Sequence, residues 1–424
     1  MQENATDVAS GRSSCAMLLR CALLTAALTN NATVATAAQS VPGGGFMGPV
    51  ERIAIVLARE LREAPAPVSL LDAPPTDDGV AGARLAINDN NTTGRFLRQE
   101  FTLEVVESAD AKELIAQVRS KVEGGAAFVA TDASAQATLA LADALKDQPA
   151  LVFNAGSPDD RLRERDCRPN LVHTAPSRAM LADALAQYLA WKQWRRWFLV
   201  HGTGADDEAY AAALRRAAKR FGVRIVEERA FKHEAGSRRA DGGHEQIQQQ
   251  IPSFTQNVPA HDVLVVADEG GVFGEYFPYR SWDARPVAGT HGLTPASWHP
   301  ALEQWGATQF QNRFRRLANR PMRPLDYDVW VAVRSIGEAA TRARSAISAD
   351  IIAYLRSAEF ELAAFKGRRL TYRAWDGQLR QPILIATAKL PVTVSPQPGF
   401  LHQFSELDTL GVDKPETGCR AYAG

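Results

Sequence analysis

The sequence predicts an α/β fold made of two successive parallel sheets, each flanked by helices. Short apolar runs alternate with longer helical patterns, and this alternation pauses once before it resumes. The first set has strand patterns at 52–58, 101–108, 126–132 and 149–157 and helical patterns at 77–91, 108–125 and 133–148. Repeats of strand, helix and strand imply parallel pairing with helices on both faces of the sheet.

A second set follows the polar stretch 159–170, which we take as the boundary between two lobes. Its elements are the helical patterns 177–194, 205–222 and 244–257 and the strand patterns 196–202, 223–231 and 261–271. Ser177 is a plausible N-cap for the first of these helices, because its hydroxyl can accept from a free backbone N–H. The polar stretch 232–243 predicts an exposed loop, 326–343 a long amphipathic helix and 382–395 further strand material.

Composition excludes several classes of partner. The 424 residues carry 48 Lys+Arg and 48 Asp+Glu, so no overall field recruits nucleic acid or a membrane surface. "HGTGADD" (201–207) resembles a dinucleotide-binding turn, but Asp206, Asp207 and Glu208 at the helix start would repel a pyrophosphate. The chain has no Walker loop, HExxH, CxxC or GxSxG, and its histidines lack ligand spacing. We therefore expect a non-enzyme with no catalytic residue, no catalytic cofactor and no metal.

The first 38 residues have the pattern of a cleavable export signal. Arg20 precedes an apolar run from Cys21 to Leu28, and a small-residue stretch ends at Ala38. The pattern predicts a periplasmic protein without a membrane anchor, with either Met1 or Met17 as the start. A disordered tail is the alternative.

Two cysteines, Cys167 and Cys419, lie outside this leader. An even pair in a chain bound for an oxidising compartment predicts a disulfide. Two separate buried thiols are the alternative.

The stretch "TYRAWDGQLRQP" (371–382) combines a hairpin signal with an indole between two guanidiniums. Asp376-Gly377 predicts the turn, since glycine adopts positive φ without strain. On a strand, Arg373 and Trp375 would share one face. Either Arg373, Trp375 and Arg380 cover a core edge, or they hold a flat anion.

The order of elements, with the export signal, resembles the type I periplasmic solute-binding proteins, the branched-chain amino-acid-binding group of ABC importers. The segments that carry this resemblance are 79–91, 153–162, 173–185, 205–226 and 326–339. Four further segments resemble a subgroup associated with quinoprotein (PQQ-dependent) alcohol dehydrogenase systems; they are 266–293, 303–314, 365–382 and 411–419.

The resemblance implies two α/β lobes joined by three crossings, with a solute clamped between them. It places residues 50–173 and 292–372 in the first lobe and 174–291 and 373–424 in the second. The loops that follow the strands should meet at one cleft. The candidate ligand-binding residues in these loops are Ser134, Asn154, Thr203, Glu269 and Phe273.

The resemblance also bears on the ligand. Amino-acid binders of this family often carry an acid where this chain has Arg178, which favours an anionic solute. Arg373, Trp375 and Arg380 could stack on and pair with a planar carboxylated ring. The leading expectation is capture of pyrroloquinoline quinone (PQQ), for uptake by an ABC permease or delivery to a periplasmic quinoprotein dehydrogenase. The alternatives are a branched-chain or other amino acid, or a non-transport sensor or accessory protein of a periplasmic alcohol dehydrogenase.

Overall fold

A computed structural model describes residues 49–62, 75–232 and 243–422. The predicted export signal and nearly all of the predicted loop at 232–243 lie outside these residues. Within them, none of the helices combines the length and apolarity that crossing a bilayer requires.

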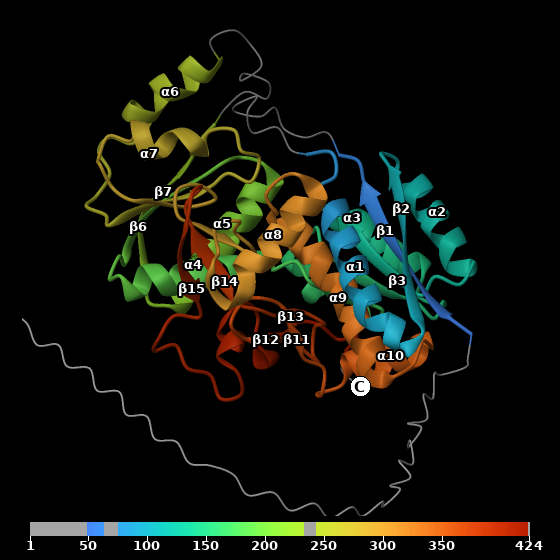
Figure 1. Cartoon of the computed structure of the whole chain (residues 1–424). Coiled ribbons are helices and arrows are strands. Elements are labelled where there is room, and N and C mark those ends of the chain that lie inside the picture. The colour runs from blue at the N-terminus through green and yellow to red at the C-terminus, as the bar shows by residue number, and fades with distance from the viewer. Residues whose placement is uncertain (1–48, 63–74, 233–242, 423–424) are drawn as a thin grey trace, which may run out of the picture. The chain divides into compact units, whose positions relative to one another are not determined.

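The first parallel sheet has the strand order β2-β1-β3-β4-β5, and Figure 1 labels its strands β1, β2 and β3. Its strands are β1 (Glu51–Glu60), β2 (Gln99–Ser108), β3 (Phe128–Asp132), β4 (Leu151–Asn154) and β5 (Leu171–His173). Side chains of β1 alternate between two cores: Ile55 and Leu57 enter one, and Val56 and Ala58 enter the other. This period of two shows that both faces of the sheet are buried.

Helices cover the two faces of this sheet. The Ile55 core takes side chains from α1 (Val80–Leu97), α8 (Ala307–Ala318), α9 (Pro324–Ala343) and α10 (Ser348–Arg356). The Val56 core takes them from α2 (Ala111–Glu123) and α3 (Ala135–Ala144). Figure 1 shows orange α9 running beside blue α1 although more than 200 residues separate them in sequence. The first lobe is therefore completed by a late segment of the chain.

The second parallel sheet has the order β7-β6-β8-β9. Its strands are β6 (Arg196–His201), β7 (Arg224–Ala230), β8 (Val263–Ala267) and β9 (Val287–Gly289). One face packs on α4 (Arg178–Trp191) and α5 (Ala205–Arg220), and the other on α6 (Gly243–Phe254) and α7 (Phe277–Arg280). Ser177 caps α4 as predicted, because its hydroxyl accepts from the Met180 N–H at 3.2 Å.

Antiparallel strands join the two lobes. The three-stranded sheet β10-β14-β15 is built from β10 (Thr294–Ala296), β14 (Ile383–Ala386) and β15 (Pro391–Ser395). Leu384 of β14 enters the core of the first lobe, whereas Ile383 and Ile385 enter that of the second. The crossings also bond to each other, since the Gln381 amide donates to the Thr174 carbonyl at 2.7 Å. The two-lobed α/β prediction is confirmed, and the assigned lobe boundaries stay a prediction.

The predicted hairpin forms, but with a longer turn than expected. β12 (Arg369–Tyr372) pairs with β13 (Leu379–Arg380), after β11 (Leu362–Ala363). Gly377 has a φ of 68°, yet the turn occupies Ala374 to Asp376, so Trp375 is not on a strand. The expectation that Arg373 and Trp375 share one face of a strand is therefore wrong.

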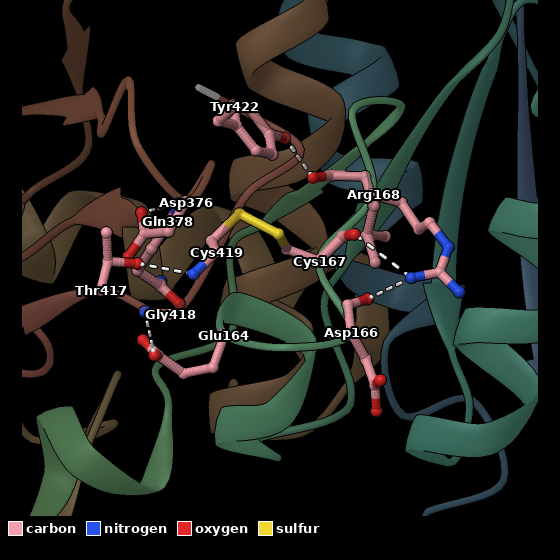
Figure 2. Close-up of a disulfide and its surroundings, with 11 residues drawn as sticks. Glu164, Asp166, Cys167, Arg168, Asp376, Gln378, Thr417, Gly418, Cys419 and Tyr422 are labelled. Carbon is pink, nitrogen blue, oxygen red and sulfur yellow. Dashed lines mark hydrogen bonds between the residues drawn. A yellow bond between two sulfur atoms is a disulfide. The ribbon is translucent and has the colours of Figure 1, made fainter. Parts of the chain in front are cut away.

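The predicted disulfide between Cys167 and Cys419 is confirmed (Figure 2). It links residues 252 positions apart and attaches the C-terminal segment to the loop before β5. Both cysteines are buried.

Candidate functional site

A cavity of about 810 Å³ lies where strands of both sheets end. Arg59 to Arg62 stand at and after the end of β1, Asp132 ends β3 and Ser134 follows it, and Ser157 to Asp159 follow β4. From the second lobe, Gly204 to Asp207 follow β6, and Glu269 and Gly270 follow β8. Open parallel sheets bind ligands at the carboxyl ends of their strands, so the topology marks this cavity as the candidate solute site, called the cleft below.

In the first lobe the cleft is organised by two carboxylates. Glu60 accepts from the Ser134 N–H at 2.6 Å and so fixes the start of α3. Asp132 accepts from Arg62 at 3.0 Å, with Arg59 at 3.8 Å. Burial raises the pKa of Asp132, and the two arginines oppose that shift.

In the second lobe the cleft is organised by Arg178, whose side chain is 5% exposed. Its guanidinium donates to Glu269 at 2.8 and 2.6 Å and to Asp206 at 2.8 Å. Burial lowers the pKa of Arg178, but hydrogen bonding and charge from Glu269 outweigh burial and raise it overall. The arginine therefore stays charged, and its charge is matched by carboxylates of the chain.

Asp78, just before α1, has a different environment. Burial first, then the like charge of Asp326, raises the pKa of Asp78 to about 6, against the opposing charge of Arg323. One carboxylate oxygen pairs with Arg323 at 2.9 Å, and Oδ1 is buried with no hydrogen-bond partner among the described residues. This oxygen has spare capacity for a donor.

The charges that line the cleft are mostly negative. Its basic lining residues are Arg59, Arg62 and Arg178. Its acidic lining residues are Glu60, Asp78, Asp132, Asp159, Asp206, Asp207 and Glu269. With seven carboxylates against three guanidiniums, the cleft has a formal surplus of four negative charges and favours a cationic group on a solute.

Three of the predicted ligand-binding residues, Ser134, Arg178 and Glu269, line this cleft. Asn154 does not; it is fully buried and its side chain bonds to the backbone of Ser157, so it shapes the loop. Phe273 packs against Phe231 in the second lobe's core, with ring centroids 4.7 Å apart, and Thr203 is exposed outside the lining. The structure therefore does not bring these three to the cleft.

Arg373, Trp375 and Arg380 also lie outside the cleft lining. Arg373 is buried and donates to Asp408 at 2.9 Å and to the Leu410 carbonyl at 2.6 Å. Arg380 donates to the same carboxylate at 2.8 Å. Both guanidiniums stack on Trp375, 5.3 and 5.0 Å from the ring centroid. The three side chains do cluster, as expected, but around a carboxylate of this chain.

Sequence reasoning missed most of the acidic lining. Glu60 and Asp132 stand at the ends of strands, and Asp78 stands at the start of a helix pattern. The rule that strand ends meet could therefore have found the first two. Asp206 was noted only as an obstacle to pyrophosphate, and the same negative charge here faces Arg178.

A second cavity of about 910 Å³ is lined by residues around β9 and β10, at the start of α9 and at the end of β14. Proline and aromatic residues, including Pro278, Tyr279, Trp298 and Pro300, make up much of its lining. It does not touch the ends of β1, β3 or β4, so we assign the solute to the cleft. In the described part of the chain no three potential metal ligands gather at either place.

Replacing Arg178 by glutamine should lower the free energy of unfolding by about 2 kcal/mol, because the half-buried Glu269 loses its cation. The loss of stability is smaller than that from breaking a fully buried ion pair, because Asp206, the second partner of Arg178, is 76% exposed. Urea unfolding measures the change. Arg62→Gln is the control, at an arginine 51% exposed, and should cost less than about 1 kcal/mol. Equal effects of the two variants would contradict the central place of Arg178.

Comparison with known proteins agrees with this architecture. Residues 68–265 match the family model described as periplasmic binding protein. A search of curated proteins finds no match.

Solved structures with the same fold share little sequence with this chain. A branched-chain amino acid ABC transporter periplasmic ligand-binding protein from Burkholderia xenovorans is 17% identical, with a TM-score of 0.63, and the match covers 81% of this chain and 95% of that one. An amino acid ABC transporter substrate-binding protein from Pseudomonas fluorescens is 12% identical, TM-score 0.64, over 88% and 100% of the two chains. An ABC transporter solute-binding protein from R. palustris in complex with benzoate is 14% identical, TM-score 0.59, over 88% and 100%.

The chain thus has the two-lobed fold of the type I periplasmic binding proteins. The match to the periplasmic binding protein model and the solved structures both point to this fold.

Proposed function

We propose that this protein is a periplasmic solute-binding protein that captures a small solute with a cationic group, most simply an amino acid, for an ABC importer. The observation that carries the proposal is the surplus of carboxylates around the cleft. The amino-acid binders of the same fold support it. Capture needs only closure of the two lobes, and the proposal includes no catalytic step.

The spare acceptor capacity of the first lobe supports an ammonium ligand. Glu60 accepts from one backbone N–H, and Oδ1 of Asp78 has no partner in the described chain. A bound ammonium could donate to such oxygens. These hydrogen bonds would be charge-assisted and therefore stronger than bonds between neutral groups. Ser134 and Ser157 line the same wall, and their hydroxyl groups could donate to the carboxylate of such a solute.

PQQ is the less favoured candidate. A planar tricarboxylate would face the negative cleft. The proposed holders Arg373, Trp375 and Arg380 lie outside its lining, and the two arginines already pair with Asp408. Delivery to a quinoprotein dehydrogenase, and a sensor or accessory role, rest only on the resemblance of four sequence segments.

The test is calorimetric titration of purified protein with leucine, lysine, a diamine, benzoate and PQQ, after mass spectrometry of the solute that copurifies with native protein. We expect saturable binding of an ammonium-bearing solute, weakened at least tenfold in Glu60→Gln. Arg196→Gln, at an exposed ion pair inside the second lobe, is the matched control and should bind like the parent. Tight binding of PQQ or benzoate with no response to any ammonium compound would overturn the proposal.

A further inference from the structure

The C-terminal segment 397–422, called the strap below, bonds to both lobes. In the second lobe, Asp183 of α4 accepts from the Gly411 N–H at 2.8 Å. Arg216 and Arg220 of α5 donate to the Gly411 carbonyl at 2.9 and 2.6 Å. Gln187 of α4 donates to Thr409 at 2.9 Å. Because Asp183 and Gln187 are buried, these contacts fix the first half of the strap to the second lobe.

The other end of the strap is tied to the first lobe. Cys419 is covalently bonded to Cys167, and Glu164 accepts from the Gly418 N–H at 2.6 Å (Figure 2). Beyond the disulfide, the Tyr422 hydroxyl donates to the carbonyl of Leu171 in β5. These three ties reach the loop before the first sheet's last strand and that strand itself.

The middle of the strap is held by the β12–β13 hairpin that carries Trp375. Asp408, 1% exposed, accepts from Arg373 at 2.9 Å and from Arg380 at 2.8 Å. Arg373 also donates to the carbonyl of Leu410 at 2.6 Å. The indole of Trp375 stacks on both guanidiniums and holds them in position to bind Asp408. The unusual composition of this hairpin is thereby explained as an anchor for the strap.

Between its two lobe attachments the strap has little free chain. Gly411 is bonded to the second lobe and Gly418 to the first. The residues between them include a short 3₁₀ turn at Lys414–Glu416, where Glu416 pairs with Arg216 at 3.2 Å. A relative movement of the lobes must therefore distort the stretch between Gly411 and Gly418 or break its hydrogen bonds to the lobes, because the disulfide fixes its end covalently.

We propose that the strap is a conformational restraint on the two lobes: it narrows the range of open states, with the Cys167–Cys419 bond as its fixed end. A narrower solute-free ensemble reduces the entropy lost when the lobes close. The restraint concerns motion and is independent of which solute is bound.

Distances between spin labels at Lys112→Cys in α2 and Asp283→Cys after α7 test the restraint in the solute-free protein. Both positions are exposed, one in each lobe. We expect the width of the distance distribution to at least double in Cys167→Ser/Cys419→Ser, and to stay at the parent's width in the Arg196→Gln control. Hydrogen exchange within each sheet reports whether the lobes themselves remain folded.

An unchanged width in the folded double serine variant would overturn the proposal and leave the disulfide as a staple of local stability. If that variant does not fold, Glu164→Ala/Tyr422→Phe decides, since it keeps the disulfide and removes two other ties to the first lobe. A broader distribution supports the restraint, and the parent's width overturns it. Because no solute is present, the outcome is separate from that of the titrations above.

Discussion

Replacing Gly82 by alanine should lower the free energy of unfolding by about 3 kcal/mol, the upper range for overpacking a tight core. Gly82 lies in α1, buried against the start of α9. A methyl group on it would stand 2.0 Å from the carbonyl oxygen of Asp326 and 2.8 Å from its Cα. Those atoms belong to the backbone, so no side-chain rotation relieves the clash.

α9 cannot move away cheaply, because its first turn is fixed by the same residue. The Asp326 carboxylate accepts from the Gly79 N–H at 2.9 Å and from Arg320 at 2.6 Å, and it is fully buried. A shift of α9 that made room for the methyl group would stretch these charge-assisted bonds. The clash therefore competes with a buried network and not with a loosely packed surface.

Urea unfolding followed by tryptophan fluorescence measures this effect. Gly124→Ala is the control, because Gly124 follows α2 at a φ of −78° and its nearest neighbours, at 3.3 to 3.4 Å, are carbonyl oxygens of that helix. The control should change stability by less than about 0.5 kcal/mol. If Gly82→Ala is as stable as the control, the helices do not approach as closely as described.

The same pair of helices shows what the sequence could predict. The apolar pattern at 77–91 predicts α1, and the pattern at 326–343 predicts α9, since each depends on local periodicity. Nothing local says that Gly82 will meet Asp326, because that contact joins residues 244 positions apart. Strand order and helix positions follow from period and topology rules, whereas close contacts follow from tertiary packing.

The site divides in the same way. Ser134 and Glu269 were predicted because loops after parallel strands meet at one edge, which is a rule of topology. Arg178 lines the cleft, but it pairs with Asp206 and Glu269, which stand 28 and 91 positions later in the sequence. Trp375 was expected to bind a ligand for a similar reason. The arginines that stack on it, Arg373 and Arg380, pair with Asp408, which stands about 30 residues later in the sequence. Local chemistry predicts what a side chain can bind and leaves open which partner reaches it.

Lowering the pH from 7 to 5 should weaken binding of a cationic solute about tenfold, through Asp78. This prediction rests on the proposed function. The pKa of Asp78 is raised to about 6 in the solute-free protein, first by burial and then by Asp326. A bound cation favours the ionised carboxylate of Asp78. Below pH 6 this carboxylate is mostly protonated, so binding must first release its proton. The affinity for the solute therefore falls up to tenfold for each pH unit below 6. Above pH 7 the affinity should be nearly constant.

The substitution Asp78→Asn separates this group from the other titrating residues around it. Arg323, Arg320, Asp132 and Asp326 all act on Asp78, and burial also raises the pKa of Asp132 and Glu269. The variant should bind more weakly at pH 7 and lose most of the tenfold change, as measured by calorimetry at pH 5, 6 and 7. A full pH response in the variant would assign the effect to another carboxylate.

The pH dependence of stability should have the opposite sign, and this gives an independent check. Because the folded pKa of about 6 exceeds the ordinary aspartate pKa of 3.8, the folded solute-free protein binds a proton at Asp78 more tightly than the unfolded chain does. This group therefore destabilises the fold above pH 6, and its cost disappears as the pH falls toward 4. Relative to Asp78→Asn, the parent should gain stability on acidification while it loses affinity. Parallel changes in the two quantities would mean that loss of folded protein, and not protonation of the cleft, weakens binding.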